Sequence, residues 1–168
     1  HAATTPVSRE VLAEMLPYFE QRFGNPSSVH RLGQAARRAL EESRERVAEA
    51  VDAHPRGVVF TSGATEADNQ ALFGALGLHQ GGLVVSATEH PAVLTAAKRV
   101  AAQGRAVTFV QPEPNGAVPL EGIREALEAQ AVDGGTALVA VMYVNNETGV
   151  VTLPAAVAEL AHEYGALF

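Results

Sequence analysis

The segment Val58–Asn69, which reads VVFTSGATEADN, holds residues that together could bind a phosphate group. Its β-branched run predicts a short buried strand over 58–61, and a glycine turn at Gly63 leads into a predicted helix. The first turn of a helix carries unpaired N–H groups and the positive end of the helix dipole, and both favour an anion. Thr65 could add a hydroxyl donor, so we expect this segment to cradle a phosphate.

Two further polar segments follow predicted strands. Ala87–His90 comes after an apolar strand at 83–86, and Val144–Glu147 comes after one at 137–143. Ligands bind outside the carboxyl ends of the strands in open α/β sheets, so we expect these segments and Ser62–Thr65 to meet at one edge. They offer a glycine turn, an imidazole and two amides, which could hold a phosphate, stack on a flat ring and hydrogen-bond its substituent.

Each of these residues also has a structural alternative. Thr65 could be only the N-cap of its helix, and His90 only a polar residue near a helix start. Asn145 and Asn146 could only shape a turn. Lys98 is the one lysine of the chain, and it lies in the middle of a predicted helix. A Schiff-base lysine needs a desolvated position facing its cofactor, so we expect Lys98 to be a surface residue.

Helices and short apolar strands alternate along the chain, which indicates βαβ units. Apolar periodicity and capping residues predict helices at 9–19, 32–52, 66–76, 91–103, 119–130 and 153–164, and strands at 58–61, 83–86, 106–110 and 137–143. Gly165–Phe168 has the composition of a further strand at its start. The expected fold class is therefore α/β, with a mostly parallel sheet and helices on both faces.

The composition excludes several classes of protein. A formal net charge of −7 argues against a surface for nucleic acid or anionic membranes. The absence of cysteine excludes a disulfide framework and a thiolate metal site, and the histidines show no metal-ligand spacing. The 168 residues suffice for one domain with its own core. Because no apolar run could span a bilayer and no signal peptide is recognised, a cytoplasmic setting is expected.

Five motifs in order resemble the cysteine desulfurases of the class V aminotransferase family, which depend on pyridoxal 5'-phosphate (PLP). They are His1–Pro6 (HAATTP), Phe23–His30 (FGNPSSVH), Phe60–Asn69 (FTSGATEADN), Glu89–Leu94 (EHPAVL) and Val144–Gly149 (VNNETG). The resemblance implies the large domain of an aspartate aminotransferase-like PLP enzyme.

The resemblance also implies roles for individual residues. At the matching positions, Ala64 and Thr65 would hold the cofactor phosphate. His90 would stack on the pyridine ring and take part in proton transfer. Asn146 would hydrogen-bond the hydroxyl of the ring.

A reaction and partners follow from the same resemblance. Members of the family take sulfur from L-cysteine and leave L-alanine. They carry the sulfur as a persulfide on a catalytic cysteine to acceptors such as iron–sulfur scaffold proteins. The family is homodimeric, with active sites near the subunit interface.

The family's Schiff-base lysine and persulfide cysteine have no counterpart among these residues, and neither has the aspartate that pairs with the pyridine nitrogen. We therefore expect residues 1–168 to be the N-terminal part of the PLP-binding large domain. The remaining large-domain strands and the small C-terminal domain would be absent, and the 168 residues alone would be inactive. The alternatives are a selenocysteine lyase or another class V PLP enzyme, and a noncatalytic binding or assembly module.

Overall fold

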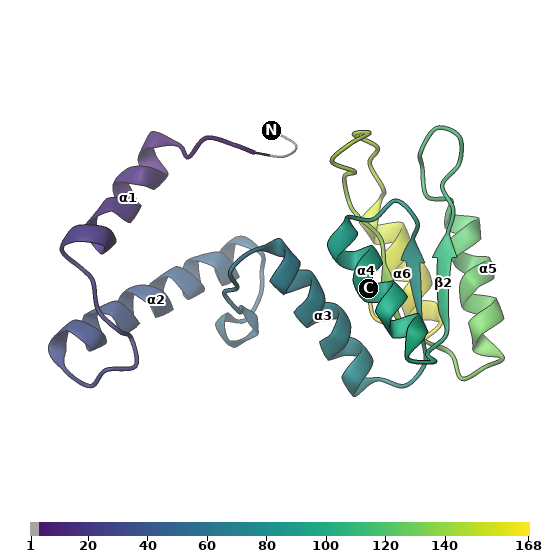
Figure 1. Cartoon of the computed structure of the whole chain (residues 1–168), viewed down its shortest axis with the longest axis horizontal. Helices are drawn as coiled ribbons and strands as arrows, with labels where there is room; N and C mark the ends of the chain where they lie inside the picture. The colour runs from purple at the N-terminus through teal and green to yellow at the C-terminus, as the bar shows by residue number, and fades with distance from the viewer. Residues whose placement is uncertain (1–3) are drawn as a thin grey trace. The chain divides into compact units, whose positions relative to one another are not determined.

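The computed structural model describes residues 4–168, so the start of the HAATTP motif lies outside the described residues. The chain forms two units, His1–Phe60 and Thr61–Phe168. The first unit contains α1 (Arg9–Glu20), α2 (Arg31–Ala50) and the short 3-10 helix η1 (Pro55–Gly57) (Figure 1). The second unit contains α3 (Ala64–Leu78), β1 (Gly82–Ser86), α4 (Pro91–Ala102), β2 (Val107–Val110), α5 (Leu120–Ala131), β3 (Thr136–Ala140) and α6 (Pro154–Glu163).

The helices of the first unit begin at capping residues. Ser8 caps α1 by accepting a hydrogen bond from the N–H of Val11. His30 caps α2 by accepting at Nδ1 from the N–H of Gly33, at 3.4 Å. A Cβ at Gly33 would lie 2.3 Å from the carbonyl oxygen of Ser28, so α2 can pack on the preceding loop only because this residue is glycine.

The predicted strand over 58–61 is wrong. No strand within residues 4–168 pairs with this run, and β-branched residues cannot form a strand without a partner for their backbone groups. The carbonyl of Val58 instead accepts a hydrogen bond from the Arg44 guanidinium. That guanidinium lies 5.0 Å from the centre of the Phe60 ring.

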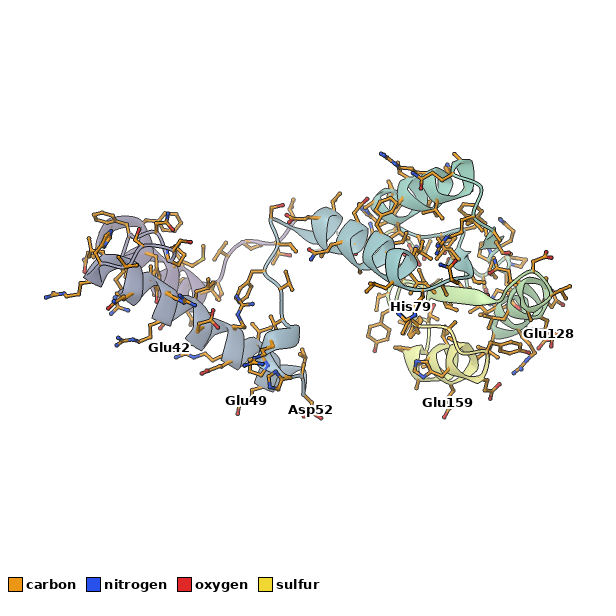
Figure 2. All side chains as sticks on the ribbon, turned by 90° about the horizontal axis from the view of Figure 1, so that it is seen from below. Glu42, Glu49, Asp52, His79, Glu128 and Glu159 are labelled. Atoms are coloured by element: carbon orange, nitrogen blue, oxygen red, sulfur yellow. The ribbon has the colours of Figure 1, made fainter. Side chains whose placement is uncertain are left out.

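The sheet of the second unit is parallel, with the strand order β2-β1-β3. Val84 of β1 faces α5 and α6, whereas its neighbours Leu83 and Val85 face α3 and α4. This alternation places one apolar core on each side of the sheet. The predicted α/β fold, with a parallel sheet covered by helices on both faces, is confirmed. Acidic side chains such as Glu128 and Glu159 lie on the outer surfaces of α5 and α6 (Figure 2).

The end of β3 differs from the sequence prediction. The strand expected over 137–143 is shorter, because the N–H of Met142 donates to the Glu89 carboxylate rather than to a neighbouring strand. On the other side of β3, Leu167 pairs with Leu138 in a parallel bridge. The strand start predicted in the last residues of the chain is therefore present as one bridge alongside β3.

Gln130 of α5 connects all three strands of the sheet. Its side chain is buried, and Nε2 donates to the carbonyl of Leu83 at 3.1 Å and to Oγ1 of Thr108 at 3.0 Å. Its Oε1 accepts from Oγ1 of Thr136 at 2.7 Å. A Cβ at Gly82 would lie 2.3 Å from this Oε1, so the close approach of the amide requires glycine there. Gln130 therefore holds β1, β2 and β3 together.

We predict that Gln130→Leu lowers the free energy of unfolding by about 1–3 kcal/mol, because two threonine hydroxyls and a carbonyl lose their partner. Urea denaturation followed by circular dichroism measures this change. The matched control is Gln80→Leu, the same substitution at an exposed position, which should change stability by less than about 0.5 kcal/mol. Equal effects of the two substitutions would contradict the role assigned to Gln130.

Candidate functional site

The segments that leave β1 and β3 diverge at the carboxyl edge of the sheet. β1 is followed by α4, which packs on one face, and β3 is followed by α6, which packs on the other. Because β1 and β3 are neighbours, the segments that follow them part and leave a crevice between them. Open α/β sheets bind ligands at such a reversal of strand order.

A pocket of about 390 Å³ adjoins this point and extends from it along β3 toward Phe168, which follows the bridge partner Leu167 on the edge of β3 away from β1. Its polar lining groups are Asp68 of α3, together with Glu89 and His90 after β1. Most of its remaining wall is apolar, formed by Ala71, Leu72, Val93, Leu138, Val139, Ala140, Val141, Met142 and Phe168. A volume between roughly 300 and 1,000 Å³ and an apolar wall with a few polar groups are typical of small-molecule and cofactor sites.

His90 is both the N-cap of α4 and a wall of this pocket. Its Nδ1 accepts a hydrogen bond from the N–H of Ala92 at 3.1 Å. In the neutral ring the proton is then on Nε2, since Nδ1 is the acceptor. The structural role considered for His90 is confirmed, and it leaves the ring face and Nε2 available to a ligand.

Glu89 is a pocket residue that sequence reasoning missed. Its side chain is nearly buried, and its carboxylate accepts a hydrogen bond from the N–H of Met142. Burial raises the pKa of Glu89 to about 7; the Met142 N–H opposes this rise, and the carboxylate of Asp68 adds to it. The only sequence signal was an acidic residue directly before His90.

The first turn of α3 has N–H groups without partners. Gly63 is the N-cap and supplies no side-chain acceptor. The N–H groups of Ala64 and Thr65 make no hydrogen bond within residues 4–168. The helix begins at Ala64, so the interpretation of Thr65 as N-cap is wrong. Thr65 is exposed and lies on the same helix face as Asp68, one turn away from the pocket wall.

The carboxylate of Glu66 turns back from this first turn toward Ser62. It accepts from the Ser62 N–H at 2.8 Å and from the Ser62 hydroxyl. These hydrogen bonds lower the pKa of Glu66, with the hydroxyl contributing most. Glu66 therefore accepts from the N–H and the hydroxyl of Ser62. The N–H groups of Ala64 and Thr65 stay available to a ligand.

The two neighbouring asparagines have different surroundings. Oδ1 of Asn145 accepts from the N–H groups of Glu147 at 3.0 Å and Thr148 at 2.9 Å, and its Nδ2 donates to the Thr88 carbonyl at 3.0 Å. Asn146 is exposed, and its side chain makes no hydrogen bond in the part of the chain that the structure describes. The turn-forming role considered for both residues therefore belongs to Asn145.

Of the four site residues predicted from the sequence, His90 lines the pocket, whereas Ala64, Thr65 and Asn146 do not. All four lie in the same unit and are exposed. Lys98 is exposed on α4, as predicted.

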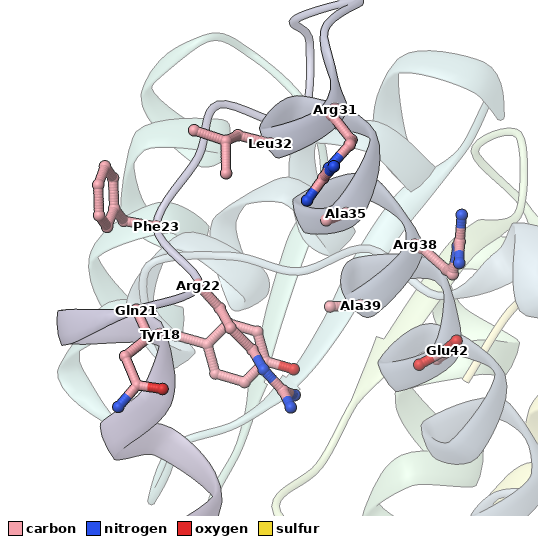
Figure 3. A pocket seen from close by; sticks show the side chains of 10 residues that line it. All are labelled: Tyr18, Gln21, Arg22, Phe23, Arg31, Leu32, Ala35, Arg38, Ala39 and Glu42. Atoms are coloured by element: carbon pink, nitrogen blue, oxygen red, sulfur yellow. The ribbon is translucent and has the colours of Figure 1, made fainter.

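The first unit has a pocket of its own, of about 380 Å³ (Figure 3). Arg22, Arg31 and Arg38 line it together with Glu42, and the Arg22 guanidinium lies 5.9 Å from the centre of the Tyr18 ring.

Across residues 4–168, no three histidine or acidic side chains are grouped as metal ligands. No helix in this range combines the length and the apolar character needed to cross a membrane.

Comparison with known proteins gives a consistent result. The sequence matches the family Aminotransferase class-V over residues 1–168. It is 41% identical over 172 residues to "Cysteine desulfurase IscS" of Methylococcus capsulatus, covering 100% of this chain and 41% of that protein. It is 44% identical over 176 residues to "Cysteine desulfurase" of a Frankia species, covering 98% of this chain and 41% of that protein.

Solved structures agree with the sequence matches. A "NIFS-LIKE PROTEIN" has a TM-score of 0.88 at 30% identity, covering 98% of this chain and 44% of that one. DndA from Streptomyces lividans has a TM-score of 0.79 at 40% identity, covering 97% of this chain and 44% of that one. The chain spans about two fifths of the length of these curated relatives. It belongs to the class V aminotransferase family, whose cysteine desulfurases are PLP-dependent enzymes.

Proposed function

We propose that the protein carrying this chain is a PLP-dependent cysteine desulfurase. It would take sulfur from L-cysteine, leave L-alanine and pass the sulfur to an acceptor such as an iron–sulfur scaffold protein. We further propose a cytoplasmic homodimer in which residues 1–168 are the N-terminal part of the large domain. The observation that carries the proposal is the pocket that reaches the carboxyl ends of β1 and β3, walled there by His90, in a chain about 40% identical to named cysteine desulfurases.

The residues around this pocket fit PLP. The apolar wall and the imidazole of His90 suit a flat pyridine ring, and the open N–H groups of Ala64 and Thr65 suit a phosphate. A Cβ at Gly63 would meet nothing within 4 Å, so there is space beside these N–H groups. The exposed amide of Asn146 suits the ring hydroxyl.

When bound, PLP withdraws electrons from the α-carbon of an amino-acid substrate. The role of this chain is to hold and orient that group. His90 has its Nδ1 fixed by the N–H of Ala92, so Nε2 is the atom at which we propose that it holds or transfers a proton.

We predict that the intact protein, supplied with PLP, converts L-cysteine to L-alanine, whereas residues 1–168 alone do not. The 168 residues contain no cysteine to carry sulfur, and their one lysine is exposed on the outside of α4. Quantitative amino-acid analysis of alanine measures the reaction, with L-selenocysteine as a parallel substrate. Turnover by the 168 residues, or a reaction of the intact protein with L-selenocysteine only, would contradict the proposal.

We predict that two substitutions at His90 separate its structural role from its cofactor role. His90→Asn keeps a side-chain acceptor at the N-cap and loses the ring, so PLP affinity should fall while stability stays within about 0.5 kcal/mol. His90→Phe keeps a flat ring and loses the cap, so stability should fall by about 1 kcal/mol while PLP affinity is largely retained. Absorbance titration with PLP and urea denaturation measure the two effects. Unchanged PLP affinity in His90→Asn would contradict the role proposed for the ring.

We predict that Glu89 makes stability decrease with rising pH between about 4.5 and 7. The folded pKa of about 7 lies above the ordinary 4.5, so the folded protein keeps a proton that the unfolded chain releases. This contribution is fully present below pH 4.5 and is lost as the pH rises through 7. Relative to Glu89→Gln, the wild type should lose roughly 2–3 kcal/mol over this interval. Parallel stability curves for the two proteins from pH 5 to 8 would show that Glu89 does not titrate in this way.

A further inference from the structure

Two side chains bridge the crevice between β1 and β3, and each comes from a different loop. Glu89, in the loop after β1, accepts a hydrogen bond from the N–H of Met142, in the loop after β3. Asn145, in the loop after β3, donates from Nδ2 to the carbonyl of Thr88, in the loop after β1, at 3.0 Å. Each loop therefore binds the backbone of the other through one of its own side chains.

Both hydrogen bonds lie in surroundings that strengthen them. Glu89 is only 8% exposed, and a polar group so buried costs free energy unless it is hydrogen-bonded. Thr88 and Asn145 are half-buried. The N–H of Thr88 donates to the hydroxyl of the fully buried Ser86 at 3.1 Å, which fixes the residue whose carbonyl Asn145 binds.

The two bridging residues directly precede two residues of the proposed site. Glu89 precedes His90, and Asn145 precedes Asn146. The two loops lead to helices on opposite faces of the sheet. Within residues 4–168, the pairing of β1 with β3 ends at Val85 and Ala140, so it does not hold the two loops at a constant distance. The reciprocal hydrogen bonds supply that connection.

We infer that Glu89 and Asn145 are positioning residues, which set the separation of His90 and Asn146 by tying the two loops together across the crevice. This inference rests on the proposed function, because His90 and Asn146 are taken there as the residues that contact PLP. We call the pair of hydrogen bonds, Glu89 to Met142 and Asn145 to Thr88, the crevice clip.

Substitutions can remove the crevice clip while leaving local contacts in place. Asn145→Asp keeps the Oδ1 acceptor that binds its own turn and removes the Nδ2 donor that reaches Thr88. Glu89→Ala removes the acceptor for Met142, whereas Glu89→Gln keeps an oxygen acceptor and loses only the charge. Asn115→Asp is the matched control, because Asn115 is another turn asparagine, whose Oδ1 accepts from the N–H of Ala117 at 2.9 Å.

The experiment is hydrogen–deuterium exchange of the intact protein without added PLP. Asn145→Asp should speed exchange about fivefold to tenfold in peptides covering 87–92, and Glu89→Ala should do the same in peptides covering 141–149. Glu89→Gln should restore slow exchange, and Asn115→Asp should leave both segments unchanged. Faster exchange confined to the loop that carries the substitution would overturn the inference, because a purely local role has that effect.

PLP titration of the same variants provides a second measurement. Each variant that breaks the crevice clip should weaken PLP binding about tenfold. The double variant, Glu89→Ala with Asn145→Asp, should lose about as much as the weaker-binding single variant, because the two bonds act as one unit. Fully additive losses would overturn the inference. If the variants show the reciprocal exchange effects but the wild-type protein binds no PLP, the proposed function is overturned and the crevice clip stands.

Discussion

The architecture of the second unit depends on the position of β1 at the centre of its sheet. β1 is buried along its whole length, with a parallel strand on each side. β2 pairs on one side of β1 and β3 on the other, and with right-handed crossovers the helices that follow β1 and β3 cover opposite faces. The loops after β1 and β3 separate as a consequence. The polar end of the pocket at Glu89 and His90, and the need for a connection between the two loops, both lie at that separation.

Two buried polar side chains, Gln130 and Glu89, act at different places and in different ways. Gln130 has all of its partners within the sheet and carries no charge, so it stabilises the three strands. Glu89 has one backbone donor, faces a pocket and lies near the carboxylate of Asp68, so its pKa is raised. Perturbed carboxyl groups in clefts are typical of functional sites. The contrast supports a structural role for the first residue and a site role for the second.

Local signals in the sequence predicted the elements whose ends are set by local chemistry. Pro91 and Gly104 bracket α4 closely, and the apolar run at 83–86 became the central strand. The run at 58–61 has the same β-branched composition and forms no strand, because propensity does not supply a pairing partner. The burial of Glu89 was not predictable either, since it depends on Met142, 53 residues further along the chain. The motif around His90 lies in a loop that lines the pocket, and only the structure separated the hydrogen bonds of Asn145 from the exposed side chain of Asn146.

The proposed function requires that PLP binds outside the carboxyl ends of β1 and β3. A crystal structure of the intact protein grown with PLP would show whether it does. We predict density for the pyridine ring against His90, with the phosphate at the open N–H groups of Ala64 and Thr65. PLP bound elsewhere, for example in the arginine-lined pocket of the first unit, or no PLP in a crystal of the folded protein, would contradict this placement.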